Sequence, residues 1–281
     1  MIDLNTNAKN TWCIGCGNFA ILNAIKAVIN ELVTEGLPVE NIVLTAGIGC
    51  HAKLVDYVNV NSFYSLHGRA IPPAAGIKIS DPRLKVIAHS GDGDAYGEGI
   101  EHLIFAAKRN IDITVLVHNN RVYGLTTGQY TPTSPEGYKG RSTPFGTKEK
   151  PMNPLEIMLA SGATFIARGT SGAIPSLKKV IKEAITHKGF SIVDILQTCV
   201  TYCDMYDYYD KRIYELEGHD PHNYDQALGK IREWDYNKDA KIPIGLFYKK
   251  ESPVFEESFR LSGDEGRDRN NIIKKILAGS D

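Results

Sequence analysis

The chain has 281 residues, enough to bury one large core, and a single large α/β domain with appendages is the natural expectation. Its 32 basic and 33 acidic residues give a net charge of −1, which excludes the strongly basic surface typical of nucleic-acid-binding proteins. No apolar stretch is long enough to cross a bilayer, and the N-terminal sequence lacks a signal-peptide core, so we expect a cytoplasmic protein with neither a nucleic-acid nor a membrane partner.

The first half of the chain alternates between helical and strand-like patterns. Apolar residues recur at three- and four-residue steps from Phe19 to Leu32, which predicts a helix that Gly36 and Pro38 end. The predicted elements that follow are a strand over 41–46, a helix over 72–79, a strand over 84–88, a helix over 97–109 and a strand over 111–117.

A long polar loop, rich in glycine and proline, is expected over residues 123–151. A loop of this length inside a compact domain is usually functional or a lid. Alternation then resumes, with a helix over 155–161, a strand over 164–167, a helix over 173–187 and a strand over 191–196. Alternating strands and helices predict an α/β fold with a doubly wound, mostly parallel sheet and right-handed crossovers.

The composition changes after residue 203, where tyrosine, aspartate and charged residues become frequent. Residues 242–248 predict a short apolar strand, and residues 270–277 show a short helical pattern. We therefore divide the chain into one domain over 1–203 and an irregular C-terminal arm over 204–281. The arm is expected to pack on this domain or on a partner subunit.

Polar residues follow two neighbouring strands of the predicted sheet. Gly91-Asp92-Gly93 comes after one strand, and Asn119-Asn120 after the next. Both sites fall at the carboxyl edge of a parallel sheet, where ligands bind. A carboxylate, an amide oxygen and a nearby backbone carbonyl suit octahedral Mg²⁺ that also holds phosphates. Each short motif alone is common as a turn or loop start, but together, in this context, they predict a diphosphate held through a metal.

Five cysteines are distributed unevenly along the chain. Cys13 and Cys16 form a C-x-x-C pair, Cys50 follows a Gly-Ile-Gly turn, and Cys199 and Cys203 lie far downstream. Structural zinc usually needs a second pair, and a thioredoxin-like site needs a different context. Thiolates from three separate loops fit an iron–sulfur cluster, whereas buried, inert cysteines are the alternative.

The Gly-Asp-Gly to Asn-Asn spacing resembles the fingerprint of thiamine diphosphate enzymes. The resemblance implies that the side chains of Asp92 and Asn120 bind Mg²⁺, and that the carbonyl of Val122 completes the protein's share of the ligands. It makes thiamine diphosphate the expected cofactor, held by the domain over 1–203.

A longer set of motifs, spread over residues 11–203, resembles the β subunits of 2-oxoacid:ferredoxin oxidoreductases. The motifs are Trp12-Cys13-Ile14-Gly15-Cys16-Gly17, Gly47-Ile48-Gly49-Cys50, His67-Gly68-Arg69, the Gly-Asp-Gly and Asn-Asn pair, Gly124-Leu125-Thr126, Gly128-Gln129 and Cys199-Val200-Thr201. The resemblance implies that Cys13, Cys16, Cys50 and Cys199 hold a [4Fe–4S] cluster close to thiamine diphosphate. Cys203 matches no ligand of that family and is expected to be a plain thiol.

The resemblance also implies which residues contact the cofactor and the substrate. The cofactor-binding set is Ile48, Gly49, His67, Gly91, Asp92, Gly93, Asn120, Val122, Gly124, Leu125 and Thr126. The substrate-binding set is Lys53, Arg69 and Thr127, and the catalytic roles fall to Lys53 and His67. Lys53 would face the substrate and His67 the thiazolium or diphosphate, whereas Arg69 can equally anchor its own loop. His51, His89 and His118 are interpreted as hydrogen-bonded structural histidines.

The chain departs from the family pattern at two positions. Ile14 stands where proline is common, which changes the stiffness of a loop but not its ligands. Thr127 stands where lysine is frequent, and loss of that cation bears on the choice between 2-oxoacids with and without a second carboxylate.

The activity implied by the resemblance is the coenzyme A-dependent oxidative decarboxylation of a 2-oxoacid to acyl-CoA and CO₂, with electrons passed to ferredoxin. The sequence offers no second domain to supply the glutamate that activates the cofactor, so an α (or fused γα) subunit is expected to complete the site. The alternatives are a thiamine diphosphate-dependent decarboxylase or synthase subunit without redox chemistry, and a zinc-stabilised scaffold without catalysis.

Overall fold

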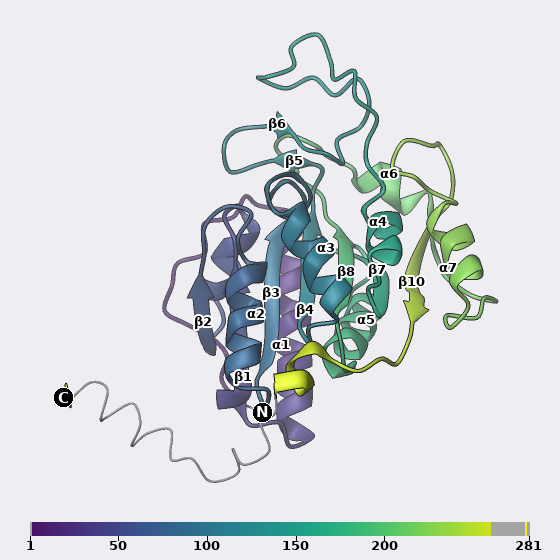
Figure 1. Ribbon diagram of the computed structural model, residues 1–281. Helices are drawn as coiled ribbons and strands as arrows, with labels where there is room; N and C mark the ends of the chain where they lie inside the picture. The colour runs from purple at the N-terminus through teal and green to yellow at the C-terminus, as the bar shows by residue number, and fades with distance from the viewer. Residues whose placement is uncertain (1, 260–278, 280–281) are drawn as a thin grey trace.

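An eight-stranded sheet runs through the protein, with strands in the order β2-β1-β3-β4-β8-β7-β10-β9 (Figure 1). The computed structural model describes residues 2–259 and residue 279. Neighbouring strands are parallel except β10, which pairs antiparallel with β7. The strands are β1 (Ile42–Ala46), β2 (Asn61–Tyr64), β3 (Lys85–Gly91), β4 (Thr114–Asn119), β7 (Phe165–Thr170), β8 (Ser191–Leu196), β9 (Ile213–Glu215) and β10 (Ile242–Lys249). The predicted α/β fold with a mostly parallel sheet is confirmed.

Helices cover both faces of the sheet. The helices are α1 (Asn18–Thr34), α2 (Ile71–Ser80), α3 (Ile100–Arg109), α4 (Pro154–Ala160), α5 (Ile174–Thr186), α6 (Tyr206–Asp210) and α7 (Tyr224–Ile231). One apolar cluster joins α1 and α5 to one face, and a second joins α2, α3 and α4 to the other; Figure 1 shows α2 and α3 in front of the sheet and α1 behind it. Within the described residues, no helix is long and apolar enough to cross a membrane.

Burial on both faces explains why the central strands read as apolar runs. Burial also explains why the predicted strands over 84–88 and 111–117 end too early. β3 and β4 extend to Gly91 and Asn119 and so include His89, Ser90 and His118, which are polar but buried beneath the loops at the carboxyl edge. An apolar pattern cannot reveal a strand end whose polar side chains are buried and hydrogen-bonded.

Other differences concern short elements at the edges. The strand β2 was not predicted; all its residues are exposed, so it lacks a buried face that would leave a pattern. The predicted helix over 97–109 begins only at Ile100, because Gly93–Glu98 (η3) form a separate π-helical turn, a form often found at functional sites. The predicted loop over 123–151 begins with a hairpin of β5 (Val122–Tyr123) and β6 (Gln129–Tyr130).

The segment after residue 203 contributes to the same sheet. β10, predicted as a strand over 242–248, pairs with β7, and β9 pairs with β10. The buried guanidinium of Arg168 on β7 lies 5.1 to 5.3 Å from the ring centroids of Trp234, Tyr236 and Phe247. These cation–π contacts, made in a desolvated setting, stabilise the docking of this segment. The boundary at residue 203 stays a prediction, and the helical pattern over 270–277 lies outside the described residues.

A pair of buried histidines joins β3 to β4. Nδ1 of His89 lies 3.0 Å from Nε2 of His118, whose Nδ1 lies 2.8 Å from Oδ1 of Asn18 on α1. Burial lowers the pKa of His89 to about 3, and burial also lowers the pKa of His118 well below its usual value. These contacts fit the structural role predicted for both histidines.

We expect the two histidines to make folding stability depend on pH. Their pKa values are lower in the folded than in the unfolded state, where a histidine titrates near pH 6.5, so the unfolded state binds more protons as the pH falls. The free energy of unfolding should therefore decrease by about 1.4 kcal/mol per pH unit for each histidine as the pH falls from 6.5.

Urea titrations at a series of pH values measure this slope. His89→Gln should reduce it by removing one titrating group, whereas His222→Gln, at an exposed histidine, should leave it unchanged. Equal slopes in wild type and His89→Gln would show that His89 is not held neutral in the fold.

Candidate active site

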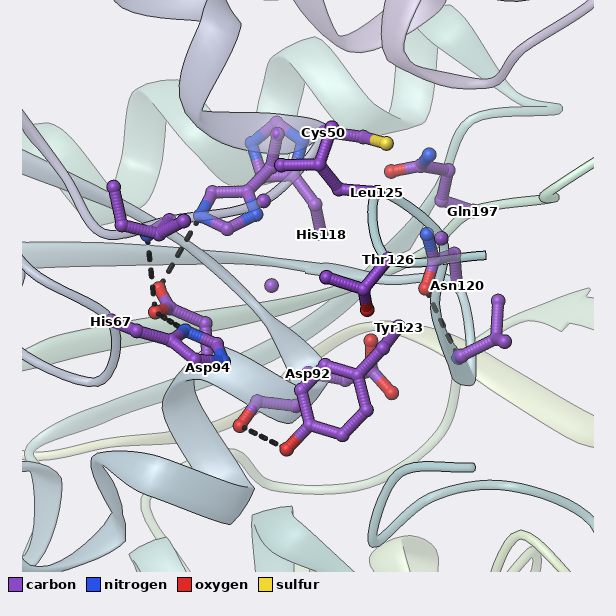
Figure 2. A pocket seen from close by; sticks show the side chains of 17 residues that line it. Cys50, His67, Asp92, Asp94, His118, Asn120, Tyr123, Leu125, Thr126 and Gln197 are labelled. Carbon is purple, nitrogen blue, oxygen red and sulfur yellow. Dashed lines mark hydrogen bonds and ion pairs between the residues drawn. The ribbon is translucent and has the colours of Figure 1, made fainter. Parts of the chain in front are cut away.

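A pocket lies where the loops after β1, β3 and β4 meet at the carboxyl edge of the sheet (Figure 2). Every residue predicted to bind the cofactor lines it: Ile48, Gly49, His67, Gly91, Asp92, Gly93, Asn120, Val122, Gly124, Leu125 and Thr126. Cys50, His51, Asp94, His118, Tyr123 and Gln197 complete the lining. The structure therefore gathers the predicted cofactor residues from separate loops into one cavity.

Asp92 follows β3 and is 1 % exposed. Its Oδ2 accepts hydrogen bonds from the hydroxyls of Thr131 at 2.5 Å and Thr133 at 2.7 Å, both on the long loop beyond β6. Burial raises the pKa of Asp92 to about 6, against the opposing effect of these two hydroxyls. Since a buried carboxylate is costly without a positive partner, a divalent cation would stabilise its ionised form.

Asn120 supplies the second predicted ligand from the end of β4. Its Oδ1 accepts a hydrogen bond of 3.1 Å from the amide of Val122, and Arg121 between them has a positive φ of 61° that turns the chain. Figure 2 shows Asp92 and Asn120 in the same cavity, beside Tyr123. An amide oxygen keeps a second lone pair for a metal, so the Asp92, Asn120 and Val122 oxygens fit the hard-oxygen preference of Mg²⁺.

The glycines on either side of Asp92 are required by close packing. A Cβ on Gly93 would lie 2.1 Å from the ring of Tyr123, and a Cβ on Gly91 would lie 2.8 Å from Nδ1 of His51. Both contacts are far too short for a real side chain. The Gly-Asp-Gly sequence thus lets the pocket wall close around the carboxylate.

Asp94 is a site residue that the sequence analysis missed. It is 2 % exposed, and its carboxylate accepts hydrogen bonds from the backbone amides of Ile48 at 3.2 Å and Gly68 at 2.7 Å. Burial alone would raise the pKa of Asp94, but the nearby imidazoles of His51 and His67 and the amide of Gly68 hold it far below its usual value. The hydrogen bond between His67 and Asp94 also raises the pKa of His67. The available signal was the second aspartate of Gly-Asp-Gly-Asp, on the same turn as Asp92.

The loops that carry the cysteines meet beside this pocket. The amide of Gly17 donates to the carbonyl of Thr198 at 3.4 Å, which joins the C-x-x-C loop to the loop that contains Cys199. A Cβ on Gly124 would lie 3.6 Å from each of three atoms: Nδ2 of Asn120, Sγ of Cys50 and Sγ of Cys199. One point in the pocket wall therefore adjoins a predicted Mg²⁺ ligand and two predicted cluster ligands.

Cys13 and Cys16 are near enough to Cys50 to influence its pKa. Burial raises the pKa of Cys50 to about 11, and the charges of Cys16, Cys199 and Cys13 add to this effect. Burial also raises the pKa of Cys16, with further contributions from Cys199 and Cys13. The protonated forms of Cys16 and Cys50 are thus favoured, and cluster assembly would have to displace these protons.

Structural zinc and an iron–sulfur cluster place different demands on their thiolate ligands. Across residues 2–259 and residue 279, no three histidine, cysteine, aspartate or glutamate side chains are arranged to hold one ion. A structural zinc needs four ligands within about 2.3 Å of one centre. In a [4Fe–4S] cluster each thiolate binds a different iron, so wider separations fit. The kind of metal that these thiols hold stays a prediction. Cys203 is buried, and its backbone forms an isolated antiparallel β-bridge with the backbone of Cys199.

The predicted substrate residues lie outside the pocket lining. Lys53 is in the 3₁₀ helix η2 (His51–Asp56), where its charge lowers the pKa of Cys50 against the larger effect of burial. Arg69 donates from Nη1 to the carbonyl of Glu98 at 3.0 Å, which fits the alternative that it anchors its loop. Thr127 accepts a hydrogen bond of 3.0 Å from Nη1 of Arg141. The substrate roles of all three stay predictions.

Comparisons with known proteins give two family models that match the chain. Residues 47–195 match the C-terminal TPP-binding domain of thiamine pyrophosphate enzymes, and residues 199–262 match the C-terminal region of the pyruvate ferredoxin oxidoreductase β subunit. Over 86 % of its length, the chain is 43 % identical to the 2-oxoacid:ferredoxin oxidoreductase subunit beta of Saccharolobus solfataricus, 82 % of which is covered.

Two further relatives extend the comparison. The chain is 42 % identical to 2-oxoacid:ferredoxin oxidoreductase 1, subunit beta, of Aeropyrum pernix, over 86 % of this chain and 79 % of that protein. Among solved structures, it resembles a 2-oxoglutarate:ferredoxin oxidoreductase from Magnetococcus marinus with 2-oxoglutarate, coenzyme A and succinyl-CoA bound. The TM-score is 0.88 and the identity 34 %, covering 99 % of this chain and 95 % of that one.

Proposed function

Because the chain belongs to the β subunits of 2-oxoacid:ferredoxin oxidoreductases, we propose that it catalyses the coenzyme A-dependent oxidative decarboxylation of a 2-oxoacid, with electrons passed through a [4Fe–4S] cluster to ferredoxin. The products are an acyl-CoA and CO₂. The observation that carries this proposal is the shared neighbourhood of Asn120, Cys50 and Cys199 around Gly124. A site that only decarboxylates has no use for such thiols.

The chain has a thiamine diphosphate-binding domain. In our proposal, Asp92, Asn120 and the carbonyl of Val122 hold Mg²⁺, which in turn holds the diphosphate. When bound, thiamine diphosphate supplies the nucleophile and the electron sink for decarboxylation. The chain's own part is to hold the metal through Asp92, whose carboxylate Thr131 and Thr133 orient.

The four thiols of Cys13, Cys16, Cys50 and Cys199 are proposed to hold the cluster. Gln197 Nε2 lies 3.8 Å from Sγ of Cys16, and the hydroxyl of Thr201 lies 3.5 Å from Sγ of Cys13. Hydrogen bonds to the sulfurs tune the potential of an iron–sulfur cluster. A cluster beside the pocket can accept electrons one at a time, as ferredoxin requires.

Exposed apolar side chains near the pocket support the proposal that a partner subunit binds here. Ile48 is 39 %, Leu66 75 % and Leu125 46 % exposed, and Ile48 and Leu125 line the pocket itself. Clustered exposed apolar side chains are typical of protein interfaces. We propose that an α (or fused γα) subunit covers these side chains, completes the active site and excludes water.

Lys53→Ala should raise the KM for the 2-oxoacid about tenfold while changing the KM for coenzyme A less, since a lost contact between a cation and a carboxylate costs about 1.4 kcal/mol. Steady-state assays of the assembled enzyme measure both constants. Lys108→Ala, at an exposed lysine on α3, is the matched control. A larger effect on coenzyme A would remove Lys53 from the substrate side of the site.

The surroundings of Thr127 bear on substrate preference. The neutral Thr127 replaces the lysine frequent in the family, but Arg141 brings a guanidinium against its hydroxyl. We propose that this cation keeps acids with a second carboxylate among the candidates.

Anaerobic co-expression with candidate α subunits tests the function. The assay follows viologen or ferredoxin reduction with pyruvate, 2-oxoglutarate and branched 2-oxoacids, with and without coenzyme A. Reduction that depends on both the acid and coenzyme A supports the proposal. Decarboxylation without reduction, in a protein free of iron, would favour a non-redox decarboxylase or synthase, and bound zinc without activity would favour a scaffold.

A further inference from the structure

We propose that Asp94 is a positioning residue that fixes His67 through Nδ1 and so presents Nε2 of that ring to the 2-oxoacid in the cofactor pocket. The identity of the substrate rests on the proposed function, whereas the contacts between Asp94 and His67 lie within this chain. Figure 2 shows the rings of His67 and Tyr123 and the carboxylate of Asp94 around one cavity.

The carboxylate of Asp94 is held from three separate segments. Its Oδ1 lies 2.6 Å from Nδ1 of His67 and accepts from the amides of Gly68 and Ile48. Its Oδ2 accepts from the hydroxyl of Ser90 at 2.5 Å and lies 3.3 Å from Nε2 of His51. A Cβ on Gly47 would lie 2.0 Å from Oδ2, so the carboxylate is packed as well as bonded. Asp94 cannot rotate away from His67 without breaking several contacts.

This arrangement determines which nitrogen of His67 is left for a ligand. A carboxylate accepts hydrogen bonds, so Nδ1 carries the proton and the neutral ring keeps Nε2 as an acceptor. On protonation, Nε2 becomes a donor. The imidazole lines the pocket and is 38 % exposed, in contrast to the buried Asp94, so Nε2 is within reach of a bound molecule.

In its protonated form the His67 ring donates from Nε2, and such a donor fits the chemistry of a 2-oxoacid. Its carboxylate and its ketone are both hydrogen-bond acceptors, and negative charge develops on the ketone oxygen when the carbon is attacked. A donor that is oriented beforehand stabilises that charge without reorganising in the transition state. The edge of the His67 ring against Tyr123, with centroids 5.7 Å apart, adds a second restraint on its orientation.

Kinetics of the assembled enzyme give the first test. Asp94→Asn removes the negative charge beside Nδ1 and turns one of two oxygens, both of which accept hydrogen bonds, into a donor. It should therefore lower kcat for the 2-oxoacid about 10²-fold, as expected for a misplaced catalytic group, and change the KM for coenzyme A less than threefold. Asp112→Asn is the matched control, because it removes a carboxylate from an ion pair of 2.6 Å with Lys78, outside the pocket. That variant should lose stability but keep kcat.

A double variant separates positioning from general structure. If Asp94 acts through His67, Asp94→Asn combined with His67→Ala should be no slower than His67→Ala alone. Multiplicative losses would overturn the inference, as would a wild-type kcat in Asp94→Asn.

A spectroscopic readout tests the geometry without turnover. In the assembled complex labelled with ¹⁵N-histidine, at a pH where the ring is neutral, His67 should show a protonated Nδ1 and a bare Nε2, and Asp94→Asn should redistribute that tautomer. A protonated Nε2 in the wild type would overturn the inference. Absence of 2-oxoacid-dependent reduction in the wild type would instead reject the proposed function. The tautomer of His67 would then still test whether Asp94 positions that ring.

Discussion

Asp92→Ala is expected to weaken the binding of Mg²⁺–thiamine diphosphate at least ~100-fold, because it removes the charged ligand of the metal. The fold should survive. The variant removes Asp92 as an acceptor for the hydroxyls of Thr131 and Thr133, but Ser134 and Asn119 remain within hydrogen-bond distance of them. The cost is therefore at most about 1–3 kcal/mol each, which is a fraction of typical domain stability. Calorimetric titration of the assembled protein with cofactor and Mg²⁺ measures the loss.

Two controls make this result specific to the metal site. Thr133→Val removes a hydrogen bond to Asp92 but no ligand, so it should weaken binding only about tenfold. Asp112→Asn removes a carboxylate outside the pocket and should leave cofactor affinity unchanged. Unchanged affinity in Asp92→Ala would refute the assignment of Asp92 as a metal ligand.

Cys50→Ser is expected to abolish the iron–sulfur cluster, whereas Cys203→Ser should keep it. Cys50 lines the cofactor pocket and interacts electrostatically with Cys13, Cys16 and Cys199. Serine offers a harder oxygen ligand that a cluster of this kind accepts poorly. Iron content and the iron–sulfur absorbance of anaerobically purified protein measure the outcome.

Cys203 is the control because it is a buried cysteine on the same loop as the predicted ligand Cys199. Its amide donates to the carbonyl of Cys199 at 2.9 Å, a contact that serine at position 203 preserves. Loss of iron in Cys203→Ser, with retention in Cys199→Ser, would show that the fourth ligand was wrongly assigned. Equal loss in Cys50→Ser and Cys203→Ser would mean that the set of ligands is larger or different.

The features that the sequence predicted share a physical basis. The parallel sheet follows from apolar runs that alternate with amphipathic helices, since both sheet faces must be covered. The pocket lining follows from motifs that sit directly after β1, β3 and β4, because the carboxyl ends of parallel strands meet at one edge. Short-range patterns suffice wherever the chain topology itself brings residues together.

The features that the sequence did not reveal depend on contacts between distant segments. Asp94 matters because His67, Gly68 and Ile48 converge on its carboxylate, and no local pattern encodes that convergence. The strand β2 is exposed on every residue and leaves no apolar signature. The anchoring of the long loop through Thr131 and Thr133 likewise appears only once the loop is folded over Asp92.

An anaerobic crystal structure of the assembled enzyme, with anomalous diffraction recorded at the iron edge, tests the central claim most directly. The account predicts iron bound by Cys13, Cys16, Cys50 and Cys199, and a diphosphate-bound cation at Asp92, Asn120 and Val122 in the adjoining pocket. Iron at any other set of residues, or a cofactor whose diphosphate lies away from Asp92, would contradict it.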